Sequence, residues 1–94
     1  MKRIAIFGST GSIGSSLLEI IKDDKKNFKI ELLTANKNYK KLIKQVNLFN
    51  VKNIVITDYS SFLIATKLLK NTEVKVFKNF DTLNKIFDIN NKID

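Results

Sequence analysis

All three glycines of the chain lie in one short stretch, which is the part of the sequence best suited to hold a ligand. The stretch IFGSTGSIGSS covers residues 6–16 and places its glycines three apart, at Gly8, Gly11 and Gly14. Glycine accepts the positive φ of a sharp turn and lets backbone approach a ligand closely. A helix that follows such a turn offers unpaired N–H groups and partial positive charge, which favour phosphate. The spacing therefore predicts a turn that binds the pyrophosphate of a dinucleotide.

The flanking residues place this turn between a strand and a helix. The apolar run at residues 4–7 is typical of a buried strand. Apolar residues then recur at helical spacing, and we expect them to form the buried face of a helix: Ile13, Leu17, Ile20 and Ile21. The alternative is an ordinary turn that binds nothing, because the spacing is G-x-x-G-x-x-G rather than the commoner G-x-G-x-x-G. Its position at the first strand-to-helix junction favours nucleotide binding.

Composition excludes several kinds of site. The 94 residues include no cysteine and no histidine, which excludes disulfides, thiolate metal sites and a histidine base. A chain of this length makes one domain at most. We therefore expect no catalytic and no metal-binding residue within it. No apolar stretch approaches the length of a membrane span, and residues 1–3 lead directly into a strand, so we expect a soluble cytoplasmic protein with no membrane partner.

The basic charge of the chain raises the question of nucleic-acid binding. The net charge is +8 and the pI is near 9.8. All 17 basic residues except Arg3 are lysines, and they are scattered along the chain rather than clustered. Such scatter is typical of a solvated surface, so we expect no nucleic-acid partner.

The rest of the chain alternates predicted strands with predicted helices. We expect strands over residues 28–34, 53–57 and 73–77. Three helices should present apolar residues at helical spacing: Tyr39, Leu42, Val46 and Phe49, then Phe62, Ala65 and Leu69, then Phe80, Leu83 and Phe87. Asn38 should cap the first of these, and Asp58 or Ser60 the second. The alternation predicts an α/β fold, a Rossmann-like parallel sheet with helices on both faces, incomplete at the C-terminus because no further strand is left to flank the first.

The residues after the second predicted strand favour NADPH over NADH. Enzymes that use NAD commonly place an acid there for the ribose hydroxyls, whereas a basic residue accommodates the 2'-phosphate of NADP. Lys37 stands at this point, while Glu31 falls inside the predicted strand. In the alternative interpretation, Lys37 is one of many solvated lysines and Asn38 only caps a helix.

The motif GSTGSIG at residues 8–14, followed by Lys37-Asn38 after the second strand, resembles the 1-deoxy-D-xylulose-5-phosphate reductoisomerase family over essentially the whole chain. The resemblance implies that residues 1–94 are part of the N-terminal NADPH-binding domain, without the catalytic and C-terminal domains. It implies cofactor contacts from Thr10, Gly11, Ser12 and Ile13 at the NADPH phosphates, and from Asn36, Lys37 and Asn38 at the ribose phosphate. Asn36 departs from the family, because many members have glycine there.

The implied activity belongs to non-mevalonate isoprenoid biosynthesis. A full-length member isomerises and reduces the phosphosugar 1-deoxy-D-xylulose 5-phosphate to 2-C-methyl-D-erythritol 4-phosphate with NADPH. It uses Mg²⁺ or Mn²⁺ held by later segments, and we expect a homodimer. Two alternatives remain, a small nucleotide-binding module without catalysis and a fragment of another NADP-dependent reductase. A Tyr-x-x-x-Lys pair of such reductases is absent, since Ile43 and Leu63 stand four residues after Tyr39 and Tyr59.

Overall fold

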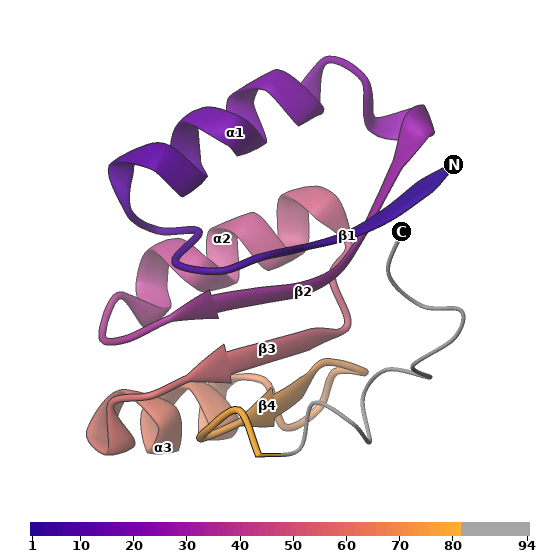
Figure 1. Cartoon of the computed structure of the whole chain (residues 1–94). Helices are drawn as coiled ribbons and strands as arrows, with labels where there is room; N and C mark the ends of the chain where they lie inside the picture. The colour runs from indigo at the N-terminus through magenta and orange to yellow at the C-terminus, as the bar shows by residue number, and fades with distance from the viewer. Residues whose placement is uncertain (82–94) are drawn as a thin grey trace.

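Strands and helices alternate along the chain, and a computed structural model describes residues 1–81 (Figure 1). The strands are β1 (Lys2–Ile6), β2 (Phe28–Ala35), β3 (Asn53–Ile56) and β4 (Lys75–Phe77). The helices are α1 (Ser12–Lys22), α2 (Tyr39–Phe49) and α3 (Tyr59–Leu68), with a short 3-10 turn at Lys25–Asn27. The predicted strands are confirmed, with ends that shift by one or two residues. Leu83 and Phe87 of the last predicted helix lie outside the described residues.

The four strands form one parallel sheet in the order β1-β2-β3-β4. This arrangement confirms the predicted Rossmann-like α/β class. Because the order is consecutive, each right-handed crossover steps in the same direction, and the three described helices lie on one face of the sheet (Figure 1). The expected helical cover of the second face has no counterpart among residues 1–81. In the same range, no strand pairs with the outer edge of β1.

The main core lies between the sheet and the helices. Leu33 of β2 and Ile54 of β3 are neighbours in the register and are fully buried. The predicted apolar faces of α2 and α3 are confirmed, because Leu42, Val46 and Ala65 pack into this core. These helices need no long hydrophobic run, since side chains three and four positions apart share one face.

The buried face of α1 differs from the prediction. Gly14, Leu18 and Ile21 face the core. The other residues of the predicted face are exposed: Ile13 (86%), Leu17 (42%) and Ile20 (70%). The reason is the packing of α1 on the glycine turn, because a Cβ at Gly14 would lie 2.6 Å from the carbonyl oxygen of Gly8. This close approach of two backbones fixes how the helix is rotated, and the apolar periodicity alone could not.

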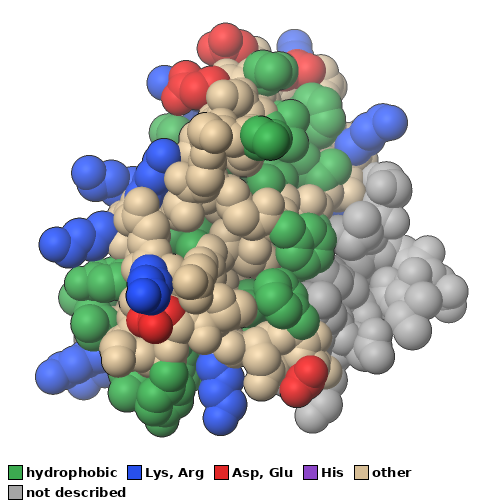
Figure 2. Space-filling model, turned by 60° about the vertical axis from the view of Figure 1, so that its left-hand side comes forward, with side chains coloured by type: hydrophobic (Ala, Val, Ile, Leu, Met, Phe, Trp, Pro, Cys, Tyr) green, Lys and Arg blue, Asp and Glu red, His purple; other side chains and the backbone are tan. Residues whose placement is uncertain are grey.

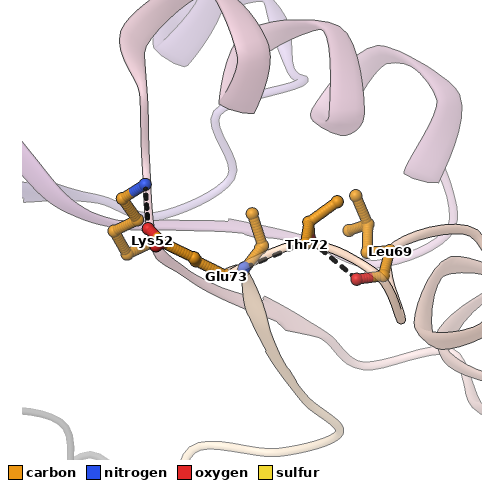
Figure 3. A network of polar contacts seen from close by, with 5 residues as sticks. Lys52, Leu69, Thr72 and Glu73 are labelled. Atoms are coloured by element: carbon orange, nitrogen blue, oxygen red, sulfur yellow. Dashed lines mark hydrogen bonds and ion pairs between the residues drawn. The ribbon is translucent and has the colours of Figure 1, made fainter.

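A small polar network closes the loop between α3 and β4 (Figure 3). Lys52 Nζ lies 2.9 Å from Glu73 Oε2, and this hydrogen bond lowers the pKa of the Glu73 carboxyl. Thr72 Oγ1 donates to the Leu69 carbonyl at 2.6 Å and accepts from the Val74 N–H at 3.2 Å. The network lies at the amino ends of β3 and β4, which is the opposite end of the sheet from the glycine turn.

Candidate functional site

The two segments predicted to bind a cofactor follow the carboxyl ends of neighbouring strands. Residues 8–14 come after β1, residues 36–38 come after β2, and Ile6 and Leu33 pair near these ends. Ligands of parallel α/β sheets bind at this end of the strands. Figure 2 looks toward this end: many Lys and Arg side chains project along the left side of the view, and hydrophobic side chains are exposed right of its centre and at its lower left.

The three glycines differ in how their surroundings would receive a side chain. Gly8 has φ of +68°, a conformation that side chains disfavour. Gly14 is required by the close packing of α1 on the turn. Gly11 has extended backbone (φ −74°, ψ 175°), and a Cβ there would make only an ordinary 3.4 Å contact with the Gly8 oxygen. Among residues 1–81, only this ordinary contact would meet a side chain at position 11, and the missing Cβ leaves open space beside the turn.

The amino end of α1 is left open, unlike those of the other two helices. The Asn38 side chain caps α2 by accepting from the Lys41 N–H at 3.2 Å. The Asp58 side chain caps α3 by accepting from the Ser61 N–H at 3.1 Å. At α1 the capping residue is Gly11, which has no side chain, and the first turn contains no acidic residue. The N–H groups of this turn therefore stay available to an anion.

A cleft of about 580 Å³ opens beside this helix end and the outer edge of β1. Among the predicted site residues, Gly11, Ser12 and Ile13 line it, together with the exposed ring of Phe7. Its volume lies within the range of small-molecule pockets. The cleft therefore combines open N–H donors with apolar walls. Thr10 is half-buried on the other side of the turn, where its carbonyl faces α2.

Two buried side chains that the sequence did not single out hold the turn in place. Thr34 of β2 accepts the Gly8 N–H on its hydroxyl at 2.8 Å and the Ser9 N–H on its carbonyl at 3.0 Å. Gln45 of α2 accepts from the Ser9 hydroxyl at 2.8 Å and donates to the Ser9 carbonyl at 2.9 Å. Ser9 is fully buried, so its hydroxyl supports the turn and does not face a ligand. One signal could have found Gln45, because it interrupts the apolar face of α2 next to Val46.

The segment after β2 is exposed, and the loop between β3 and α3 holds it from one side. Asn36 accepts from the Thr57 hydroxyl at 2.9 Å, and its carbonyl accepts the Asp58 N–H at 3.1 Å. The pKa of the Asp58 carboxyl is lowered, chiefly by hydrogen bonds from Ser61 and also by the positive charge of Lys37. Lys37 therefore lies in the field of a carboxylate. Asn38 makes the predicted cap.

Glu31, the acidic rival of Lys37 in the choice of cofactor, lies away from this end of the sheet. It is largely buried inside β2, next to a shift in the register with β1. Its carboxylate lies 3.7 Å from Lys29 Nζ. Lys29 and Glu31 both lie inside β2, before its carboxyl end. Lys37 is therefore the first charged residue after this strand.

Two further properties concern the described part of the chain. Among residues 1–81, no three His, Cys, Asp or Glu side chains gather as they would around a metal ion. Within the same residues, no helix has both the length and the apolar character needed to cross a membrane.

Comparison with known proteins identifies the family. The sequence model of the 1-deoxy-D-xylulose 5-phosphate reductoisomerase family matches residues 4–92. The enzyme of that name from Pelagibacter ubique is 83% identical over 94 residues, which are 100% of this chain and 24% of the relative. The enzyme from Clostridium tetani is 42% identical over 78 residues, which cover 79% of this chain and 20% of the relative.

Solved structures give the same result. The reductoisomerase from Zymomonas mobilis in complex with NADPH superposes with a TM-score of 0.80 at 30% identity, over 90% of this chain and 22% of that one. A DOX-P reductoisomerase with NADPH, fosmidomycin and magnesium has a TM-score of 0.85 at 23% identity, which supports the fold alone. The chain spans about a quarter of the length of the curated relatives it matches, and it belongs to the 1-deoxy-D-xylulose 5-phosphate reductoisomerase family.

Proposed function

We propose that residues 1–94 are the partial N-terminal domain that binds NADPH in a 1-deoxy-D-xylulose 5-phosphate reductoisomerase. The observation that carries this proposal is the pairing of Gly11 with the uncapped amino end of α1. Helix-end N–H groups satisfy phosphate oxygens, and the missing Cβ leaves room for a pyrophosphate to reach them. The solved relative with NADPH supports the same cofactor.

The residues present fit the two charged parts of NADPH. We propose that Thr10, Gly11, Ser12 and Ile13 contact the pyrophosphate, and that Asn36, Lys37 and Asn38 contact the 2'-phosphate. Ser12 and Ile13 are exposed at the first turn of α1, where backbone donors lie open. Lys37 supplies a cation after β2, although Asp58 offsets part of its charge. NADPH supplies the hydride, and this chain's residues only bind and orient it.

For the whole enzyme we propose the conversion of 1-deoxy-D-xylulose 5-phosphate to 2-C-methyl-D-erythritol 4-phosphate. The relatives carry the name of this activity, and a solved DOX-P reductoisomerase is in complex with magnesium. Mg²⁺ or Mn²⁺ would be held outside residues 1–81, which offer no acidic cluster. The cytoplasmic location and the homodimeric state stay predictions.

The test is a titration of the full-length enzyme that carries this segment. NADPH and NADH are each titrated at equal ionic strength, and a single-stranded oligonucleotide serves as the polyanion control. We expect NADPH to bind at least tenfold more tightly than NADH and the oligonucleotide not to compete. Residues 1–94 alone, assayed with substrate, NADPH and Mg²⁺, should not consume NADPH. Absence of NADPH binding by the full-length enzyme would overturn the proposal.

A further inference from the structure

Lys41, in the first turn of α2, joins the two halves of the candidate site. Its backbone N–H donates to the Asn38 side chain at 3.2 Å, so Lys41 is fixed to the segment after β2. Its Nζ donates to the Thr10 carbonyl at 3.1 Å, which brings its ammonium group to the glycine turn. No feature of the sequence distinguishes Lys41 from the many other lysines of the chain.

The charge of Lys41 remains available to a ligand. A carbonyl oxygen takes one of the three N–H donors of an ammonium group and leaves its charge in place. Within residues 1–81, the ion pairs join Lys29 to Glu31 and Lys52 to Glu73, and neither involves Lys41. Lys37 differs, because its positive charge helps to lower the pKa of the nearby Asp58 carboxyl. Of the two lysines at the site, Lys37 lies near a carboxylate, whereas no carboxylate of residues 1–81 forms an ion pair with Lys41.

We propose that Lys41 binds the 2'-phosphate of NADPH together with Lys37 and thereby helps to select NADPH over NADH. This inference rests on the proposed function of the site. A phosphate near the Asn38 cap lies beside the first turn of α2, from which Lys41 projects. The hydrogen bond to Thr10 need not break, since two N–H donors remain. A phosphate held by two cations is bound more tightly than by one point charge, and the contact with Thr10 keeps the second cation in position without a ligand.

The test compares Lys41→Met with Lys40→Met in the full-length enzyme. Both changes remove one positive charge from an exposed position of the same helix turn, but only Lys41 contacts the glycine turn. Affinities for NADPH and NADH are measured by fluorescence titration at low and high salt. We expect Lys41→Met to weaken NADPH binding about tenfold and NADH binding less than twofold. Lys40→Met should change both by less than twofold, and the loss in Lys41→Met should shrink at high salt.

Three results would overturn the inference. Equal losses of NADPH and NADH would mean that Lys41 acts on the turn or on the pyrophosphate, which both cofactors carry. An unchanged NADPH affinity, or an equal loss in Lys40→Met, would mean that position 41 contributes only general surface charge. In each case the wild-type enzyme still binds NADPH, so the proposed function stands. Lys41→Arg keeps the charge and should keep most of the preference for NADPH.

Discussion

The same change, glycine to alanine, should lower the stability of the fold at Gly14 and the affinity for NADPH at Gly11. At Gly14 the new Cβ would lie 2.6 Å from the Gly8 oxygen and 2.7 Å from the Ser9 Cα. Both are backbone atoms of a turn that Thr34 holds through hydrogen bonds, so the turn cannot move aside. At Gly11 the Cβ would meet only the Gly8 oxygen, at 3.4 Å.

The magnitude follows from these contacts. Overpacking of a rigid site costs about 1–3 kcal/mol, and two backbone contacts under 3 Å favour the upper end. Alanine recovers roughly 1 kcal/mol over glycine within a helix. Gly14→Ala should therefore lower the free energy of unfolding by about 2 kcal/mol. Gly11→Ala should change it by about 0.5 kcal/mol or less, because its backbone conformation suits any residue.

Gly11→Ala should instead reduce the affinity for NADPH. In Gly11→Ala the methyl group occupies the space through which the pyrophosphate reaches the N–H groups of α1, and we expect NADPH affinity to fall by about tenfold or more. Urea denaturation of the full-length enzyme gives the unfolding free energy, and fluorescence titration gives the affinity. Wild-type affinity in a folded Gly11→Ala variant would refute the assignment of the turn to the pyrophosphate. Wild-type stability of Gly14→Ala would refute the packing argument.

Three further predictions concern β2 and the residues beyond it. Lys37→Ala should weaken NADPH binding about tenfold and leave NADH binding nearly unchanged in fluorescence titrations, and equal losses would assign Lys37 a structural role. Thr34→Val leaves the Gly8 N–H without its partner and should cost about 1–3 kcal/mol in urea denaturation, whereas Thr34→Ser should cost far less. The lowered pKa of Asp58 means that its carboxylate stabilises the fold above about pH 4 and that this contribution is lost as the pH falls further. Asp58→Asn keeps a capping side chain, so its stability should change less than that of the wild type between pH 6 and pH 3; an equal change would exclude this carboxylate as a cause.

Local rules were enough to predict most of the elements and the position of the site. The glycine turn, the Asn38 cap and the Asp58 cap each depend on residues within a few positions of one another, so the sequence displays them directly. The strands of a parallel sheet likewise follow from β-branched runs that alternate with helical patterns. The placement of residues 36–38 at the same end of the sheet as the glycine turn also follows, because parallel strands share their carboxyl edge.

Contacts between distant segments could not be predicted in the same way. Gln45 lies 36 residues from Ser9, and its place on the apolar face of α2 predicts burial but does not say which residue it contacts. In the sequence, Lys41 cannot be told from other surface lysines, because its contact with Thr10 exists only in the folded chain. The rotation of α1 depends on backbone contact at Gly14, which apolar periodicity does not record.

The strand and helix that hold the glycine turn also flank the second segment of the proposed site. The turn itself contributes few side chains, and its position is set by Thr34 at the end of β2 and by Gln45 on α2. The same strand and helix flank residues 36–38, which we propose to bind the ribose phosphate. Because β2 and α2 support both segments, the fold sets the relative position of the two proposed phosphate subsites. The pyrophosphate and the 2'-phosphate of NADPH are connected through the adenosine ribose, so the spacing of the two proposed subsites must match the cofactor. A spacing that the fold sets in advance lowers the conformational cost of binding.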